Sequence, residues 1–227
     1  MSYSLILLAA GNSKRFLHRI PKPFVKIAGR SLLELSLLKF DNIKQIKNII
    51  VVINKKHLKY IKKIKSKNFL KVMGGKTRQE STFKALKFIK KKKIKSSRVL
   101  IHDSARPNFS LRLIHRIINN SKKNTVVPKM IVNDALKTVF NKKKLLNLNR
   151  KNFFLTQTPQ SYNFKNILNL HLNKKLIYKD DDLSLLDSLK KVKFITGEKN
   201  NFKITSQEDL KMFKNSMNFN NVTTSLS

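Results

Sequence analysis

The sequence has no cysteine and no tryptophan among its 227 residues, and only 12 residues are acidic. The missing cysteine excludes a disulfide framework, a zinc–thiolate site and a thiol nucleophile. Long apolar runs are missing too, since residues 5–10 fall far short of the roughly 20 that a transmembrane helix needs. No cation precedes this run, as one would in a signal peptide. We therefore expect a cytoplasmic chain with no membrane partner.

The few acids are outnumbered by 50 lysines and arginines, which gives a formal net charge of +38. Such a charge fits an anionic partner, such as nucleic acid or a phosphorylated metabolite. Only nine of the cations are arginine, however. A compositional drift toward lysine, asparagine and isoleucine also explains this pattern, so the charge alone leaves nucleic-acid binding open. Hydrophobic residues make up 41% of the chain, which suffices for a buried core.

Short apolar segments alternate with amphipathic ones along most of the chain. The predicted strands are 4–10, 48–54, 69–73, 98–102, 125–127 and 192–196, and the predicted helices are 31–40, 57–65, 77–92, 111–118, 167–172, 183–189 and 207–214. Ser31 and Glu34 have the spacing of a capping box. The alternation predicts an α/β fold, in which helices flank a mostly parallel sheet. We expect one domain over residues 1–215 and a polar tail over 216–227.

Residues 135–162 break this alternation. Two β-like pieces, ALKTVF and FFLTQTPQ, flank a polar stretch that begins at Asn141. The pattern predicts an extended hairpin that projects from the sheet as a β-arm. Because a hairpin with little core of its own is marginally stable, we expect the arm to pack on another surface, often that of a second subunit.

The first group of candidate site residues follows the first predicted strand. Small residues there permit close approach to the backbone, and cations follow them; the group comprises Ala9, Ala10, Gly11, Lys14, Arg15 and Lys22. Ligands of open α/β sheets bind at the carboxyl ends of strands, so this loop is a candidate phosphate cradle. It matches neither the dinucleotide-binding nor the Walker pattern. An ordinary strand–helix turn in a lysine-rich protein is the alternative.

A second group follows the strand at 98–102. Asp103 stands where a strand ends, which suits Mg²⁺, an ion that takes one or two carboxylates together with substrate phosphates. Arg106 is placed to clamp a phosphate, although an Asp–Arg pair that caps a turn is the alternative. His102 is expected to be structural. Lys203 is a further candidate for holding an anion, with an ordinary surface lysine as the alternative.

Six motifs, in order and spacing, together resemble those of the 2-C-methyl-D-erythritol 4-phosphate cytidylyltransferase family. They are LAAGNSKR with PKP, GG-x-x-R-x-x-S at Gly74–Ser81, HDSARP at His102–Pro107, Arg150 with TPQ at Thr158–Gln160, DDDLS at Asp180–Ser184 and NFKIT at Asn201–Thr205. The resemblance runs from about Tyr3 to Leu210. It implies a Rossmann-like nucleotidyltransferase fold with a projecting arm, and condensation of CTP with methylerythritol phosphate in the presence of Mg²⁺, releasing pyrophosphate.

The resemblance also implies roles for single residues. It makes Arg15 and Lys22 the catalytic, transition-state-stabilising cations, and Asp103 the metal ligand. Substrate-positioning residues would be Arg150, Lys203 and Arg106, and nucleotide-binding residues would be Ala9, Ala10, Gly75 and Ser81, together with Gly11 of the cradle. The family forms homodimers, so we expect Arg150 on the arm to complete the active site of the opposite subunit.

Five positions depart from the family pattern. Ser13 replaces a glycine, Pro23 a glutamine, Lys76 an acid, and both Ala135 and Asp180 a threonine. Asp180 would place an acid near an anionic substrate, so the reaction class is better defined than the identity of the polyol phosphate.

Three other functions compete with this one: a ribitol-5-phosphate cytidylyltransferase, a basic nucleic-acid-binding protein and an inactive paralogue. The sequence contains no recognised RNA-binding module, and its aromatics show no surface pattern for base stacking. We therefore expect no specific nucleic-acid partner.

Overall fold

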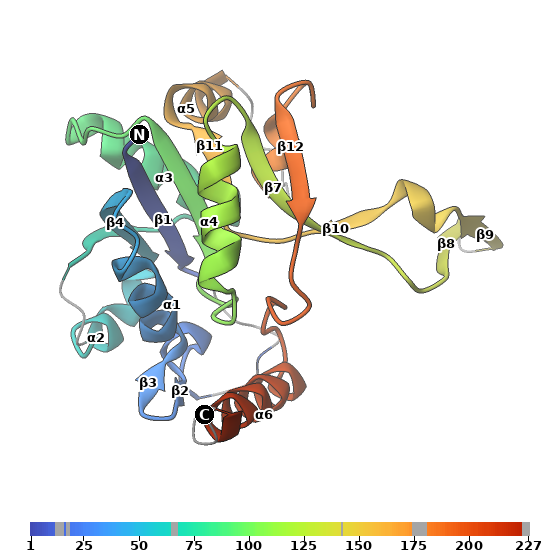
Figure 1. The fold of residues 1–227 in the computed structure, drawn as a ribbon, viewed down its shortest axis with the longest axis horizontal. Helices are drawn as coiled ribbons and strands as arrows, with labels where there is room; N and C mark the ends of the chain where they lie inside the picture. The colour runs from blue at the N-terminus through green and yellow to red at the C-terminus, as the bar shows by residue number, and fades with distance from the viewer. Residues whose placement is uncertain (12–15, 17–18, 65–67, 142, 174–180, 224–227) are drawn as a thin grey trace.

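The computed structural model describes all residues except 12–15, 17–18, 65–67, 142, 174–180 and 224–227 (Figure 1). Four residues singled out in the sequence, Ser13, Lys14, Arg15 and Asp180, lie outside the described residues.

One large sheet organises the described part of the chain. Its strands are β1 (Tyr3–Ala9), β4 (Ile46–Ile53), β5 (Leu70–Met73), β6 (Arg98–Asp103), β7 (Thr125–Ile131), β10 (Phe154–Thr156), β11 (Gln160–Asn163) and β12 (Val192–Thr196). They lie in the order β10-β7-β11-β6-β1-β4-β5, and β12 pairs with β7. The pairs of β1 with β4 and β6, of β4 with β5 and of β7 with β12 are parallel. Only β10 and β11 run antiparallel to their neighbours, so the predicted mostly parallel sheet is confirmed.

Helices cover both faces of this sheet (Figure 1). They are α1 (Leu32–Asp41), α2 (Leu58–Ile61), α3 (Arg78–Lys91), α4 (Leu111–Asn120) and α5 (Phe164–Asn173), with short 3₁₀ turns at Lys22–Phe24, Lys55–His57, Arg150–Asn152 and Leu183–Leu185. Helix α6 (Gln207–Thr223) lies below the sheet in Figure 1. Alternate residues of β1 point to opposite faces. Leu5 and Leu7 pack with α1 and α4, whereas Ile6 and Leu8 pack with α3 and α5.

A third, smaller apolar cluster lies apart from the two main ones. It joins the segment after β1 to the carboxyl-terminal part of the chain, and its buried members are Phe16, Val25, Ile27, Leu32, Ile204, Leu210 and Phe213. Val25 precedes and Ile27 ends the short β2 (Lys26–Ile27), which pairs with β3 (Arg30–Ser31). The Gln207 side chain also donates to the carbonyl of Phe16. This cluster therefore holds α6 against the segment that carries Lys22.

Local sequence signals set several helix starts. The capping box at α1 is present: the Ser31 hydroxyl accepts from the backbone N–H of Glu34, whose carboxylate accepts from the backbone N–H of Ser31. Two predicted elements differ. Helix α6 runs on to Thr223, through most of the predicted polar tail. Residues 183–189 form only a 3₁₀ turn, because the Asp181 carboxylate captures the N–H and hydroxyl of Ser184 and the backbone is extended at Leu186.

The projecting arm is present, but its pairing corrects the prediction. Strand β8 (Leu136–Phe140) pairs with β9 (Lys144–Leu148), which the sequence analysis assigned to the polar turn. The left-handed backbone of Asn141 makes the tight reversal possible. The second predicted piece instead contributes β10 and β11 to the main sheet, where the Phe154 ring packs edge-on against Phe194. The arm beyond β7 is thus a short hairpin that extends away from the body (Figure 1).

Candidate active site

A cleft opens at the carboxyl ends of β1 and β6. The chain runs from β1 to β4 on one side and later returns to β6 on the other, so this edge is the switch point where open α/β sheets bind ligands. The cleft has about 750 Å³ of empty space, including the part that opens to solvent. Eight of the sequence-predicted residues line it: Ala9, Ala10, Gly11, Lys22, Gly75, Ser81, Asp103 and Lys203.

Small residues let the β5–α3 loop lie close against β1. A Cβ atom on Gly74 would stand 2.4 Å from the Cβ atom of Ala10, so only glycine fits there. The Ser81 hydroxyl accepts from the N–H of Gly75 at 3.0 Å and donates to the carbonyl of Thr77 at 2.8 Å. Ser81 therefore shapes the loop as well as lining the cleft.

Two lysines bring positive charge to the cleft from distant parts of the chain. Pro23 is the second residue of the 3₁₀ turn at Lys22–Phe24 and is buried, so the unusual proline at this position supports a local turn. The Lys22 ammonium donates to the carbonyl of Ile204 at 2.8 Å, directly after Lys203. Lys203 in turn pairs with Asp103 at 2.8 Å. The structure therefore brings together two of the predicted cations and the predicted metal ligand.

Asp103 is the acidic group of the cleft, and both of its carboxylate oxygens are engaged. Oδ1 accepts from Nε of Arg78 at 3.1 Å, and Oδ2 accepts from Lys203. Its backbone N–H donates to the Thr158 hydroxyl at 3.1 Å, which fixes the end of β6. Burial by itself would raise the pKa of the Asp103 carboxyl, but the neighbouring Arg78 and Lys203 hold that pKa well below its usual range. Asp103 is therefore ionised.

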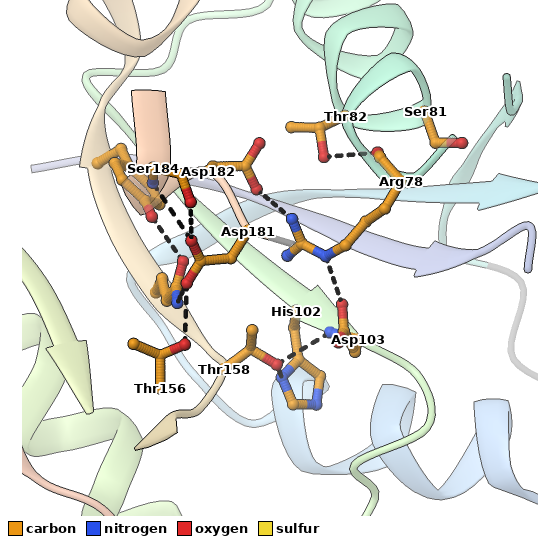
Figure 2. A network of polar contacts seen from close by, with 12 residues as sticks. Arg78, Ser81, Thr82, His102, Asp103, Thr156, Thr158, Asp181, Asp182 and Ser184 are labelled. Carbon is orange, nitrogen blue, oxygen red and sulfur yellow. Dashed lines mark hydrogen bonds and ion pairs between the residues drawn. The ribbon is translucent and has the colours of Figure 1, made fainter. Parts of the chain in front are cut away.

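Arg78 is a functional candidate to which the sequence analysis gave no role. It leaves the first turn of α3 and lies between two carboxylates, with Nε on Asp103 and Nη1 on Asp182 at 2.6 Å (Figure 2). Burial would lower the pKa of the Arg78 guanidinium, but the two carboxylates raise it above its ordinary value. The only signal in the sequence was the arginine of the GG-x-x-R-x-x-S pattern, because Asp182 stands 104 residues further along the chain.

Two predicted substrate-positioning residues do not line this cleft in the single chain. Arg106 donates to the backbone carbonyls of Asn201, at 2.8 Å, and of Thr156, at 3.4 Å, so it ties two loops together. Arg150 stands on the arm between β9 and β10, where its guanidinium donates to the carbonyl of Asn133. Lys76 and Ala135, two of the departures from the family pattern, line the cleft and a hollow of the arm, respectively.

His102 is structural, as predicted. It is fully buried, its Nδ1 lies 3.0 Å from the Thr158 hydroxyl and its Nε2 lies 3.1 Å from the carbonyl of Arg106. Because the Arg106 carbonyl can only accept, Nε2 of the neutral ring carries the proton and donates to it. Nδ1 then accepts from the Thr158 hydroxyl, whose oxygen also accepts from the N–H of Asp103. Burial lowers the pKa of His102 to about 3, which keeps the ring neutral near pH 7.

The donor set of the cleft fits a magnesium ion held jointly with a substrate. Among the described residues, no three histidine or acidic side chains are grouped as a metal site. Mg²⁺ does not require such a group, because it binds one or two carboxylates and completes its shell with phosphates and waters. Asp103 is ionised and lines the cleft, with the exchangeable ammonium of Lys203 on Oδ2.

Within the described parts of the chain, no helix has the length and apolarity to span a membrane.

Comparison with known proteins gives one family. The family model described as "IspD: 2-C-methyl-D-erythritol 4-phosphate cytidylyltransferase" matches residues 3–218. The "2-C-methyl-D-erythritol 4-phosphate cytidylyltransferase" of Thermosipho melanesiensis is 37% identical over 90% of this chain and 93% of its own length. The bifunctional enzyme IspD/IspF of Pelagibacter ubique is 41% identical over 96% of this chain, which spans only 58% of that relative's length.

Solved structures agree with the sequence comparison. The crystal structure of 4-diphosphocytidyl-2C-methyl-D-erythritol synthase from Anaerococcus prevotii superposes with a TM-score of 0.80 at 33% identity, covering 95% of each chain. The bifunctional IspDF of Campylobacter jejuni gives a TM-score of 0.79 at 33% identity, and this chain covers 54% of it. The expected nucleotidyltransferase-like fold is thereby confirmed, and the chain belongs to the 2-C-methyl-D-erythritol 4-phosphate cytidylyltransferase (IspD) family.

Proposed function

We propose that this chain condenses CTP with 2-C-methyl-D-erythritol 4-phosphate, giving 4-diphosphocytidyl-2-C-methyl-D-erythritol and pyrophosphate, a step of isoprenoid precursor biosynthesis. The observation that carries the proposal is the convergence of Lys22, Asp103 and Lys203 in one cleft of a chain that belongs to this family. CTP is a cytoplasmic metabolite, so we propose that the reaction takes place in the cytoplasm. The proposal concerns this chain and not the second activity named in the bifunctional relatives.

The chemistry needs positioning and charge rather than a general base. An oxygen of the polyol phosphate, already ionised at pH 7, attacks the α-phosphorus of CTP. The new phosphorus–oxygen bond forms as the bond to the β-phosphate breaks, and the leaving pair of electrons goes to pyrophosphate. Negative charge grows on the oxygens around the α-phosphorus, so preorganised cations lower the barrier. The absence of cysteine agrees with such a mechanism.

The residues of the cleft divide this work. The small residues Ala10 and Gly11 leave room for the nucleotide beside the end of β1, and the Gly75 loop borders it. Lys22 is held by the carbonyl of Ile204 at a fixed place, where it faces the developing charge. Lys203 would hold the phosphate of the second substrate against the repulsion of the triphosphate. We assign Arg15 to the same electrostatic task on the basis of the family pattern.

Magnesium would be held by Asp103 and by phosphate oxygens of the nucleotide. When bound, the ion would neutralise charge on the phosphates and orient them. Arg78 would keep the Asp103 carboxylate in place, which is the contribution of the protein itself.

The arm is the basis for a second proposal, that the chain works as a homodimer with shared sites. Large apolar side chains of the arm and its base are exposed in the single chain: Ile131, Val139, Phe140, Leu145, Phe153, Phe154 and Leu155. Arg150 does not reach the cleft of its own chain, and the arm extends away from the body (Figure 1). In a twofold dimer the partner subunit would cover these side chains, and the arm would bring Arg150 to the cleft of the partner.

The decisive experiment is a pyrophosphate-release assay with CTP, Mg²⁺ and one polyol phosphate at a time. We expect turnover with 2-C-methyl-D-erythritol 4-phosphate and a value of kcat/KM at least tenfold lower with D-ribitol 5-phosphate. The reverse preference would transfer the proposal to ribitol 5-phosphate. Absence of release with either, from protein that binds CTP, would identify an inactive paralogue.

A further inference from the structure

A row of alternating charges runs from the cleft into the interior. Lys203 pairs with Asp103 at 2.8 Å, Asp103 with Arg78 at 3.1 Å, Arg78 with Asp182 at 2.6 Å, and Asp182 accepts from Nε2 of His171 at 3.0 Å. We call these five residues the ion-pair chain. Figure 2 shows its central part, with Arg78 between the two carboxylates. Its members come from α3, α5, the end of β6 and two loops, so the ion-pair chain is brought together by the tertiary structure.

The outer end of the ion-pair chain is the most exposed and its inner end is buried. The Lys203 side chain is 39% exposed, those of Arg78 and Asp103 are 18% and 11% exposed, and those of Asp182 and His171 are fully buried. A half-exposed lysine exchanges partners at little cost, whereas a buried carboxylate that loses its only cation is strongly destabilised. Lys203 is therefore the exchangeable partner of Asp103, and Arg78 is the fixed one.

The inner end of the ion-pair chain is also fixed. The ring of His171 stacks on Phe83 of α3, with centroids 5.7 Å apart and planes 8° from parallel. Because an ionised carboxylate only accepts hydrogen bonds, the proton lies on Nε2 of His171, while Nδ1 is buried with no partner among the described residues. Among the described residues, His171 and Asp182 do not line the cleft, and Arg78 is what connects them to it.

We infer that Asp182 and His171 are positioning residues, which hold Arg78 so that Asp103 keeps its place when a substrate phosphate draws Lys203 away. The inference rests on the proposed function. Apolar residues of the same volume often stabilise a fold as well as a buried ion pair does. A positioning role explains why the ion-pair chain is present here instead. One oxygen of Asp103 then stays on Arg78, and the other is released toward the cleft.

The first test measures the coupling without turnover. The ring signals of His171 in the NMR spectrum of the full chain, assigned with His171→Gln, are compared between wild type and Asp103→Asn. We expect the substitution to shift the His171 signals, because the charge it removes is relayed through Arg78 and Asp182. Lys76→Ala is the matched control, since it changes one charge at the cleft outside the ion-pair chain and should leave the signals in place.

The second test separates positioning from stability. Asp182→Asn keeps the volume and removes the charge, and we expect kcat per CTP-binding site to fall about 10- to 100-fold, as for supporting residues of metal sites, with KM for CTP within about threefold. His171→Gln keeps a donor toward Asp182 and should retain several times the kcat of His171→Leu. Leu168→Ala, a buried truncation in α5, is the stability control: it should lower the melting temperature but keep kcat per site.

The outcomes distinguish the inference from the proposed function. Normal turnover in Asp182→Asn, or His171 signals that do not respond to Asp103→Asn, would overturn the inference while leaving the proposed function intact. If the wild type releases no pyrophosphate with either polyol phosphate, the proposed function fails, and the NMR comparison still decides whether the ion-pair chain couples His171 to the cleft.

Discussion

Replacing Arg106 by methionine tests whether this residue supports the fold or contacts the substrate. Methionine has a similar length and no hydrogen-bond donors, so the change would leave the carbonyls of Asn201 and Thr156 without the bonds that Arg106 provides. One carbonyl ends strand β10, and the other lies two residues before Lys203. The family pattern made Arg106 a substrate contact, whereas its position in the structure indicates a tie between loops.

The expected loss follows from the two bonds. A hydrogen bond from a charged donor contributes about 1.5–3 kcal/mol. The bond to Asn201 at 2.8 Å should give a value in that range, whereas the bond to Thr156 at 3.4 Å is near the limit of the geometry and should give less. One nitrogen of Arg106, Nε, is buried with no partner among the described residues, so its removal offsets part of the loss. We expect the free energy of unfolding to fall by about 2–4 kcal/mol.

The assay is urea denaturation followed by circular dichroism, with Arg112→Met as the matched control. Arg112 is an exposed arginine on α4, and its replacement should change the free energy of unfolding by less than about 0.5 kcal/mol. The reasoning would be refuted if Arg106→Met kept the stability of the wild type. A rise of tenfold or more in KM for the polyol phosphate, at unchanged stability, would instead make Arg106 a substrate contact.

Three further predictions concern charge. Lys22→Ala should lower kcat on the order of 10² or more with little change in KM for CTP, and near-normal turnover would contradict its electrostatic role. Mixed Lys22→Ala and Arg150→Ala chains, each inactive alone, should recover activity in about a quarter of their sites if Arg150 acts across a twofold dimer, whereas mixed dimers without recovery would place it in its own site. Burial in the folded chain lowers the pKa of His102 from 6.5 to about 3, so the unfolded chain binds a proton on His102 more readily than the folded chain does. The stability that neutral His102 contributes is therefore complete above pH 6.5 and is lost as the pH falls toward 3. Urea titrations from pH 7 to 4 should therefore show a slope up to about 1.4 kcal/mol per pH unit steeper in the wild type than in His102→Gln, and equal slopes would contradict the assignment.

The predictable parts of the fold were those with local causes. The two residues of the capping box, Ser31 and Glu34, are close in sequence, and so are the β-branched residues of β4. The sequence alone therefore indicates both features. The arm was paired wrongly because the lysines and asparagines of residues 141–152, which include β9, resemble a turn by composition. What decides the pairing is the reversal at Asn141, together with the edge of β7 that receives β10.

The site was predictable in its outline and not in its wiring. Strand ends gave Ala10 and Asp103 a common edge, because parallel neighbours end on the same side of a sheet. Arg78 was missed because the role of an arginine depends on the groups it contacts, and its partners Asp103 and Asp182 lie 25 and 104 residues away along the chain. Arg106 shows a different ambiguity, because a phosphate clamp and a tie between carbonyls use the same donors, so its contact with the substrate stays a prediction.

The small apolar cluster beneath the cleft has a consequence for its charges. Phe16 and Ile204 pack together there, one in the segment that leads to Lys22 and the other next to Lys203. The two backbone segments that carry Lys22 and Lys203 are therefore held together by uncharged side chains, whose packing salt does not screen as it screens surface ion pairs. In a chain of net charge +38, the relative placement of these two lysine-bearing segments thus depends on apolar residues such as Ile204.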